Sequence, residues 1–429
     1  MKGSRVSVTD HSAIRRLLIY RLGSLGDTLL ALPALHLIRQ SFPEAEVTLL
    51  THVPTGSKAA AMVSILEHTN LHQHVIRYPL RLRSFGQIKV LRDEIAARRF
   101  QLAIHLAEYR GPAKTLRDYI FFRACGIRRV LGLPWRREQF RGDSGRIPVL
   151  SRLANLSDGA RTFLSALGVR TSKRTGMSAL RQSWDAPGDG TEQVEWEAGR
   201  LVRRLACLGK PNLDEEKWWD LRLSDEEEAE ADKFLSPVRG PFLAASLGTK
   251  VEVNHWTESN WRPLIRQIHQ RRPDLNLVFV GAGDEFASCE RCSQDWAALK
   301  LNLCGKITPR VSAAILRRAR VFVGHDSGPL HLAATVGTPC VGIYSARHRP
   351  GQWFPRGNDN VILYHRTPCY DCGLNVCVEH RKKCILSITV EEAVAAVDKQ
   401  LGDECGALAL TPMPFGYSAE ALSRRDIRK

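Results

Sequence analysis

Short apolar runs alternate with stretches of helical periodicity along the first third of the chain. Runs of five mostly apolar residues predict buried β-strands, and these lie at residues 16–20, 47–51 and 102–106. Apolar positions with helical spacing lie at about residues 28–38, 59–66, 87–97 and 113–124. Strands that alternate with helices of this length predict a parallel α/β sheet.

A second series of the same kind occupies the last part of the chain. Its strand candidates are residues 242–246, 277–280, 321–323 and 341–344. Its helix candidates are about residues 261–270, 311–319 and 329–336. Thr389-x-x-Glu392 has the spacing of a capping box and predicts a last helix that runs to about Leu401.

The stretch between the two series is polar. Residues from about 170 to 217 are rich in Gly, Ser and Asp and contain no strand-like run, so they predict a linker with an insertion and one helix near 194–207. Ser224, followed by four acidic residues, predicts a helix start. The expected domains are a first Rossmann-like domain, a linker, a second Rossmann-like domain, and a helix with a basic tail, at residues 1–180, 181–235, 236–386 and 387–429.

Length and charge add to this organisation. A chain of 429 residues exceeds the size at which one core stops growing, which favours two domains. No run approaches the roughly 18 apolar residues of a membrane span, and the first residues lack the apolar core of a signal peptide. A cytoplasmic protein is therefore expected. The 62 Lys and Arg against 45 Asp and Glu give a net charge of +17, which indicates an anionic partner.

The first candidate site follows the first predicted strand. Gly23, Ser24 and Gly26 precede and flank Asp27 in the sequence Arg-Leu-Gly-Ser-Leu-Gly-Asp. Glycines allow a sharp turn and a close approach to a ligand. An aspartate at the following helix start would sit at the carboxyl end of the sheet, where it could act as a general base on a hydroxyl. The alternative is that Asp27 only caps the helix.

The second candidate site follows the strand that ends at Val323. Asp326, Ser327 and Gly328 precede a helix that is expected to start near Pro329, and His331 lies one turn further on. The backbone amides at such a helix start form a site suited to a diphosphate. The alternative is a capped turn with the histidine in the core, but the combination of these residues favours the ligand site.

Two further loops follow predicted strands of the second series. Lys250, in a loop that contains Gly248, could pair with a phosphate, although an exposed lysine is the simpler interpretation. Glu285, after Gly281 and Gly283, could accept hydrogen bonds from ribose hydroxyls or only start a helix. All four candidate loops come at strand ends, where α/β proteins bind ligands.

Two segments resemble glycosyltransferase family 9, the lipopolysaccharide heptosyltransferases. They are RLGSLGDTLLALPALHLIRQSFPEAEVTLLTH (21–52) and VGHDSGPLHLAATVGTPCVGIYSARHRPGQWFP (323–355). The resemblance implies a GT-B fold, with two Rossmann-like domains that face a central cleft. It implies an acceptor site in the first domain, a nucleotide-sugar site in the second, and a last helix that crosses back to the first domain. It also implies inverting transfer with no metal or other cofactor.

The resemblance assigns roles residue by residue. Asp27 matches the family's proposed general base. Asp326, Ser327, Gly328 and His331 match its donor-binding motif, and Glu285 matches a ribose contact loosely. The expected substrates are ADP-heptose or a similar nucleotide sugar and a lipopolysaccharide-core or other glycan acceptor. A peripheral contact with the anionic inner membrane is a further expectation. The family commonly has Lys-x-Trp-Pro where this chain has Asn254-His-Trp-Thr, which leaves Lys250 as the candidate for the phosphate-contacting lysine.

Four cysteines form the cluster Cys369-x2-Cys372-x4-Cys377-x6-Cys384, which also resembles one in heptosyltransferase II-like members. The spacing differs from that of a zinc ribbon, so free thiols, a structural metal site and redox pairing all stay open. Two alternatives to a glycosyltransferase also stay open. One is a GT-B nucleotide-sugar epimerase. The other is a nucleic-acid-binding protein, which only the charge suggests, since aromatic and basic residues are not interleaved as in single-strand binders.

Overall fold

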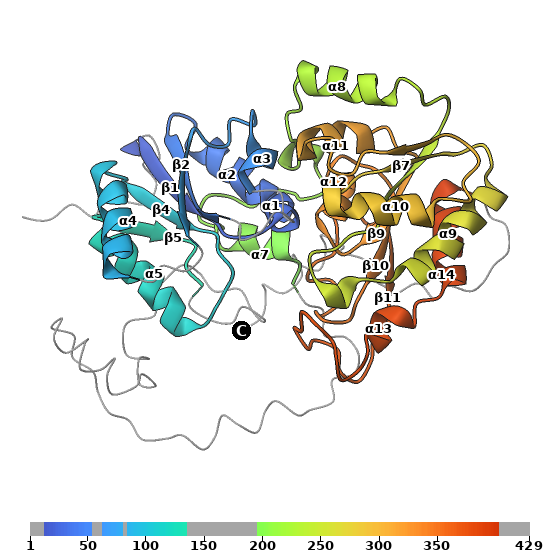
Figure 1. Cartoon of the computed structure of the whole chain (residues 1–429). Helices are drawn as coiled ribbons and strands as arrows, with labels where there is room; N and C mark the ends of the chain where they lie inside the picture. Colours follow the sequence, from blue (N-terminus) through green and yellow to red (C-terminus); the bar gives the residue numbers. More distant parts are fainter. Residues whose placement is uncertain (1–12, 54–61, 80–83, 135–194, 403–429) are drawn as a thin grey trace, which may run out of the picture. The chain divides into compact units, whose positions relative to one another are not determined.

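The computed structural model describes residues 13–53, 62–79, 84–134 and 195–402 (Figure 1). All of them belong to one of the two compact units into which the chain divides, the unit made of residues 1–138 and 194–429. The predicted helix start at 59–61, most of the predicted insertion and the basic tail lie outside the described residues. None of the helices within the described ranges is long and apolar enough to cross a membrane.

The first part of the chain builds a five-stranded parallel sheet with the order β3-β2-β1-β4-β5. Its strands are β1 (Arg16–Tyr20), β2 (Glu46–Val53), β3 (His74–Pro79), β4 (Leu102–His105) and β5 (Arg129–Leu131). Its helices are α1 (Leu25–Leu30), α2 (Leu32–Ser41), α3 (Met62–Leu66), α4 (Phe85–Ala97) and α5 (Pro112–Ala124). The three predicted strands are confirmed as β1, β2 and β4. The sequence did not reveal β3 and β5, because only one residue of β3 and none of β5 is buried.

Helices cover both faces of this sheet, as the alternation of side chains along a strand requires. Leu17 and Ile19 of β1 share a core with α1 and α2, whereas Leu18 and Tyr20 share another with α4 and α5. All four side chains are buried, which explains why β1 reads as a continuous apolar run.

The second part of the chain builds a six-stranded parallel sheet with the order β11-β10-β9-β6-β7-β8. Its strands are β6 (Phe242–Ser246), β7 (Asn276–Phe279), β8 (Lys300–Asn302), β9 (Val321–His325), β10 (Cys340–Tyr344) and β11 (Val361–Tyr364). Its helices are α9 (Glu258–Arg271), α10 (Phe286–Cys292), α11 (Pro309–Leu316), α12 (Gly328–Thr335), α13 (Lys383–Leu386) and α14 (Val390–Leu401). The four predicted strands and three predicted helices are all present.

The helices again divide between two faces. Phe242 and Ala244 of β6 pack with α11 and α12, whereas Leu243 and Ala245 pack with α9, α10 and α14. Figure 1 shows α9 and α14 side by side, and Arg271 of α9 donates a hydrogen bond to Asp398 of α14 (2.8 Å). The expectation that the last helix crosses back to the first domain is therefore wrong. Its apolar face packs on α9 and the second sheet instead.

The described part of the predicted linker, residues 195–235, contains helices and buried apolar residues. It contains α7 (Glu197–Arg203), a short 3₁₀ helix η3 (Glu216–Trp218) and α8 (Asp225–Leu235). Leu201, Leu205 and Trp219 are buried in the core that contains α2. These apolar residues occur singly along the chain and so give no strand-like run. The expected helix start at Ser224 is confirmed, and Ser224 and Glu227 form a capping box there.

Both sheets reverse their strand order beside their first strand. In the first sheet the reversal lies between β1 and β4, and in the second between β6 and β9. Ligands of parallel α/β sheets bind outside the carboxyl ends of the strands at such a reversal. Asp27, Lys250 and Asp326 follow β1, β6 and β9, so three of the four candidate segments lie at these reversals.

Candidate functional site

The loop after β1 holds the carboxylate of Asp27 against the start of α1. The Oδ2 atom of Asp27 accepts hydrogen bonds from the backbone N–H of Ser24 (2.6 Å) and from Ser24 Oγ (2.7 Å). Ser24 is the N-cap and Asp27 is the third residue of the helix, and the two form a capping box, so the carboxylate does take part in capping α1. Gly23 has a φ of +142°, and a Cβ there would lie 2.5 Å from the Cβ of Asp27. A glycine is therefore needed beside the aspartate.

A buried arginine forms hydrogen bonds with the backbone of this segment. Arg21 is 1 % exposed, and its guanidinium donates to the carbonyl oxygens of Leu106 and Asp27, both at 2.6 Å. Its positive charge is matched by Glu197 of α7 at 3.6 Å, which is also buried. Arg21 belongs to the first motif, but its hydrogen bond to the backbone of Asp27 could not be predicted from that motif.

The loop after β9 and the first turn of α12 contain two buried polar atoms for which the described residues offer no hydrogen-bond partner. Ser327 Oγ and His331 Nδ1 are buried and lack hydrogen bonds to any described residue. His331 Nε2 lies 3.6 Å from an oxygen of Asp326. α12 begins at Gly328 with Pro329 next, close to the predicted start. Buried polar atoms are almost always hydrogen-bonded in proteins, so the two orphaned atoms at a helix start indicate a ligand position.

Two glycines bring the first and second candidate loops together. A Cβ on Gly26 of α1 would lie 2.8 Å from His331 Cδ2, and a Cβ on Gly328 of α12 would lie 2.9 Å from Leu25 Cδ2. α1 and α12 are thus in direct contact at their first turns, and Asp27 lies next in sequence to Gly26. The structure places the candidate base beside the candidate donor motif.

Glu285 connects the loops after β6 and β7. Its carboxylate accepts hydrogen bonds from the N–H groups of Gly248 (2.9 Å) and Ala282 (3.2 Å). Burial raises the pKa of this carboxyl, and the two backbone bonds oppose that change. A Cβ on Gly248 would lie 2.0 Å from the Cδ atom of Glu285, so this close contact also requires a glycine. The sequence predicts a ribose contact or a helix start for Glu285. The structure adds a link between two loops, which the sequence does not indicate.

Lys250 is exposed and lies near the first sheet. Burial lowers the pKa of His52 at the end of β2, the charge of Lys250 lowers it further, and that of Asp27 raises it. Lys250 and Asp27 are therefore both close enough to His52 to act on its charge. The contact of Lys250 with a phosphate stays a prediction.

A fully buried histidine organises the donor side. His325, at the end of β9, accepts hydrogen bonds on Nε2 from the N–H of Trp256 (3.0 Å) and from the indole of Trp261 (3.2 Å). Its Nδ1 lies 3.5 Å from the carbonyl oxygen of Gly248. Burial lowers the pKa of His325 to about 3, so the ring is neutral. Sequence reasoning missed this residue, although its place at a strand end was a usable signal.

The loop after β10 was also missed. Asn254 donates to the carbonyl oxygen of Asp326 (3.3 Å) and accepts from Ser345, which follows β10. Burial lowers the pKa of His348 three residues later, and Asp326 and Asp27 both raise it. The loop therefore lies near both carboxylates. Strand 341–344 was predicted, so the basic residues after it were visible as a strand-end loop.

The four clustered cysteines lie on a segment that packs on this loop. Cys372 is exposed, Cys369 and Cys377 are partly buried, and Cys384 is buried. Within the described part of the chain, no three His, Cys, Asp or Glu side chains are grouped so that they could hold a metal ion. The geometry thus gives the metal interpretation of the cluster no support.

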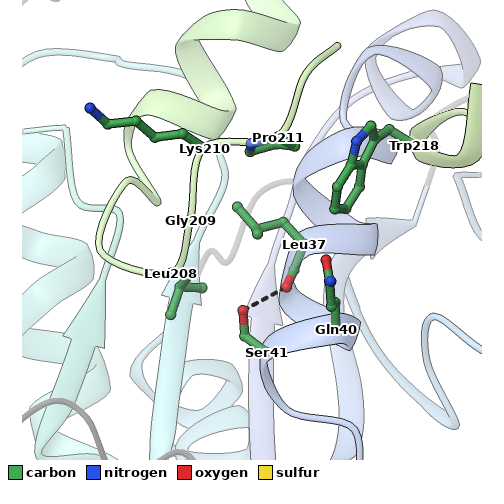
Figure 2. A pocket seen from close by; sticks show the side chains of 8 residues that line it. All are labelled: Leu37, Gln40, Ser41, Leu208, Gly209, Lys210, Pro211 and Trp218. Carbon is green, nitrogen blue, oxygen red and sulfur yellow. Dashed lines mark hydrogen bonds between the residues drawn. The ribbon is translucent and has the colours of Figure 1, made fainter. Parts of the chain in front are cut away.

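A pocket of about 410 Å³ lies elsewhere, between α2 and the segment after α7 (Figure 2). Ser41 in its wall donates a hydrogen bond to the carbonyl oxygen of Leu37 (2.8 Å). The lining residues are Leu37, Gln40, Ser41, Leu208, Gly209, Lys210, Pro211 and Trp218. None of the predicted site residues lines it, so it does not belong to the candidate site.

Sequence relatives are lipopolysaccharide heptosyltransferases. Lipopolysaccharide core heptosyltransferase OpsX of Haemophilus influenzae is 28% identical over 158 residues, which are 36% of this chain and 44% of that protein. Lipopolysaccharide heptosyltransferase 1 of Pseudomonas aeruginosa is 29% identical over 162 residues, which are 37% and 42% of the two chains. The chain thus matches less than half the length of these relatives.

Solved structures show the same fold over nearly the whole chain. A glycosyl transferase family 9 protein from Veillonella parvula has a TM-score of 0.61 at 16% identity, covering 91% of this chain and 98% of that one. ADP-heptose lps heptosyltransferase II of E. coli has a TM-score of 0.53 at 14% identity, covering 91% and 99%. The expected GT-B fold is confirmed.

The family model of glycosyltransferase family 9 (heptosyltransferase) matches residues 164–383, just over half of the chain. This match contains the loops of Lys250, Glu285 and Asp326, whereas Asp27 lies outside it. The sequence resemblance, the fold and this match agree, and the chain belongs to glycosyltransferase family 9.

Proposed function

We propose that this protein is an inverting glycosyltransferase that transfers heptose from ADP-heptose to a lipopolysaccharide-core or related glycan acceptor. The observation that carries the proposal is the contact between α1 and α12, which sets Asp27 beside the orphaned polar atoms of the donor motif. The heptosyltransferases among its relatives and the ADP-heptose named for the E. coli structure support the choice of donor.

On the donor side, the start of α12 binds the diphosphate. Its free backbone N–H groups and Ser327 Oγ donate hydrogen bonds to phosphate oxygens, and their position lets them stabilise the charge that develops as the diphosphate leaves. Gly328 keeps the chain close to α1, and the neighbouring His331 supplies an unpartnered ring nitrogen.

On the acceptor side, Asp27 takes the proton of the attacking hydroxyl. Both hydrogen bonds from Ser24 go to Oδ2, which leaves Oδ1 for that proton. The acceptor oxygen forms a bond to the anomeric carbon while the bond from that carbon to the diphosphate oxygen breaks. The electron pair leaves with the nucleoside diphosphate, and attack from the face opposite the leaving group inverts the configuration.

The role of Asp27 is tested by Asp27→Asn, with transfer from ADP-heptose to a lipopolysaccharide-core acceptor as the assay. We expect transfer to fall about 10²–10⁴-fold, the contribution of a positioned general base. Binding of ADP should persist, because Asp27 lies on the acceptor side. Asp93→Asn is the matched control, since Asp93 pairs with Arg92 on α4 of the same sheet. Transfer at the wild-type rate in Asp27→Asn would show that another group is the base.

The donor class is tested by thermal unfolding with a series of nucleotide sugars, because a ligand of the folded state raises the melting temperature. We expect the largest increase with ADP-heptose. Incubation with the donor alone should leave the sugar unchanged, and an isomerised sugar would identify an epimerase instead. If no nucleotide sugar raises the melting temperature, the proposal is wrong.

A lipid-linked acceptor would bring the protein to the inner face of the membrane. The net charge of +17, from 62 basic and 45 acidic residues, favours binding to an anionic membrane surface. We expect co-sedimentation with phosphatidylglycerol vesicles at low salt and its loss at high salt. Equal recovery with neutral phosphatidylcholine vesicles would remove this part of the proposal.

A further inference from the structure

The loop after β10 leaves the second sheet beside the donor motif. β10 pairs with β9, with Ile343 opposite His325, and the N–H of Asp326 donates to the carbonyl oxygen of Ile343 (3.3 Å). Arg347 lies four residues beyond that carbonyl. Burial lowers the pKa of Arg347, and the charges of Asp326, after β9, and of Glu108, after β4, oppose that change. Arg347 therefore lies near the donor motif and near the loop after β4 of the first sheet.

The guanidinium of Arg347 is fixed by the cysteine-bearing segment, residues 369–384. Its Nε donates to the carbonyl oxygen of Leu374 (2.9 Å), and its Nη2 donates to the carbonyl oxygen of Gly373 (3.2 Å) and to Asn375 Oδ1 (2.9 Å). The backbone is tied as well, because the N–H of Gly373 donates to the carbonyl oxygen of Arg347 (2.9 Å). Three acceptors on one short segment give the side chain a single orientation.

The acceptors that hold Arg347 are all neutral. The next arginine of the loop is different, because Arg349 Nε lies 2.8 Å from an oxygen of Asp371 and forms an ion pair. Among the described residues, Arg347 has no carboxylate in ion-pair distance, and its Nη1 has no hydrogen-bond partner. Nη1 is not one of the buried atoms without a partner in the described residues, so it is open to solvent. An anion can reach it there.

We propose that Arg347 binds the diphosphate of the nucleotide donor through Nη1, and that the cysteine-bearing segment serves to hold Arg347 in that position. The inference rests on the proposed function, since it names a further residue of the same donor site. An arginine suits this task because its planar guanidinium donates on two edges, so that one edge can be fixed while the other meets a phosphate. The segment thereby acquires a role that needs no metal and no disulfide.

Isothermal titration of ADP, AMP, UDP and UMP tests the inference in the full-length protein. The variants are Arg347→Gln and the matched control Arg349→Gln, which removes a charge from the same loop. For the nucleotide that the wild type prefers, we expect Arg347→Gln to weaken diphosphate binding about tenfold or more, the usual effect of losing one charge-assisted bond. Monophosphate binding should change less than about twofold, and Arg349→Gln should retain the wild-type preference for the diphosphate.

Arg347→Lys and the melting temperatures without ligand separate charge from folding. The lysine variant should recover part of the diphosphate affinity, because it restores the positive charge. The inference fails if Arg347→Gln binds the diphosphate like the wild type. It also fails if both glutamine variants lose mono- and diphosphate binding equally, which would show that loop order alone matters. If the wild type binds neither ADP nor UDP, the proposed function fails first and the inference with it.

Discussion

Glycines allow the close contacts on which the candidate site depends. Gly23 has a positive φ, and a Cβ atom added there would lie 2.5 Å from the Cβ atom of Asp27. Gly126 also has a positive φ, of +81°, but a Cβ there would meet nothing within 4 Å. The pair therefore separates the cost of backbone strain from the cost of displacing the aspartate.

Alanine at each of these two glycines gives a residue-scale prediction. A positive φ costs a side chain about 1–3 kcal/mol, so both variants should unfold at lower temperature. Only Gly23→Ala should also slow transfer, by about 100-fold, because a displacement of the order of 1 Å has that effect on a reacting group. Thermal unfolding and the transfer assay measure the two effects. Equal transfer rates in the two variants would show that the contact with Asp27 does not matter.

The sequence predicted the residues of this site unevenly. Asp27, Ser327 and His331 stand in short motifs directly after apolar strands, and local spacing was enough to select them as candidates. Arg347 and His325 depend on partners far along the chain. His325 is held by Trp256 and Trp261, which lie 69 and 64 residues away. The position of each residue after a strand could be seen in the sequence, but no local pattern records these contacts.

At the scale of elements, one arginine of α11 joins three segments. Arg310 is 2 % exposed and makes a two-pronged pair with Glu227 of α8. The same guanidinium donates to the carbonyl oxygens of Leu221 and of Ile65 in α3, both at 3.0 Å. α11 is thereby tied to the first part of the chain as well as to α8. Nearby, Arg317 pairs with Glu228 of α8 but is half exposed.

The two pairs between α11 and α8 should differ strongly in their contribution to stability. Arg310→Met leaves a partly buried carboxylate and the carbonyl oxygens of Ile65, Leu221 and Arg222 without their donor, so we expect a loss of about 3–5 kcal/mol in the free energy of unfolding. Arg317→Met removes an exposed pair and should cost less than about 1 kcal/mol. Urea denaturation of both variants measures the difference. Similar losses in the two would mean that Arg310 is not a clamp.

Element positions were easier to predict than element partners. β6 was predicted from its apolar run at its observed bounds, because every residue of the strand is buried. The last helix was also predicted from its capping box. Its place was not, because an amphipathic pattern tells only that one face is covered. Whether α9 or the first sheet covers that face depends on tertiary contacts with residues far away in the sequence.

For the whole molecule, buried histidines couple stability to pH. Burial lowers the pKa of His325 to about 3 and those of His72 and His105 to about 4, against 6.5 for an exposed imidazole. The unfolded chain therefore takes up protons between about pH 6.5 and 4 that the folded chain does not. These groups contribute their full stability above pH 6.5, and the contribution is lost as the pH falls through that window.

His325→Gln tests this linkage. Each proton bound only by the unfolded state changes the free energy of unfolding by about 1.4 kcal/mol per pH unit. Between pH 6 and 4.5 the wild type should lose stability as the pH falls, and the variant should lose it less steeply by about that amount. Urea denaturation at a series of pH values gives both slopes. Parallel slopes would show that His325 is protonated in the folded protein.

The carboxylate of Glu285 links two loops whose bonded residues, Gly248 and Glu285, are 37 positions apart in the chain. A Cβ at Gly248 would lie 2.0 Å from the Cδ atom of that carboxylate, and one at Gly281 would lie 2.4 Å from its Oε2 atom. Neither glycine can gain a side chain while the glutamate stays. In a recombination of related sequences, the two glycines and the glutamate therefore have to come from the same parent. Crossovers placed between residues 248 and 285 would separate them, whereas those placed outside would exchange a working pair of loops.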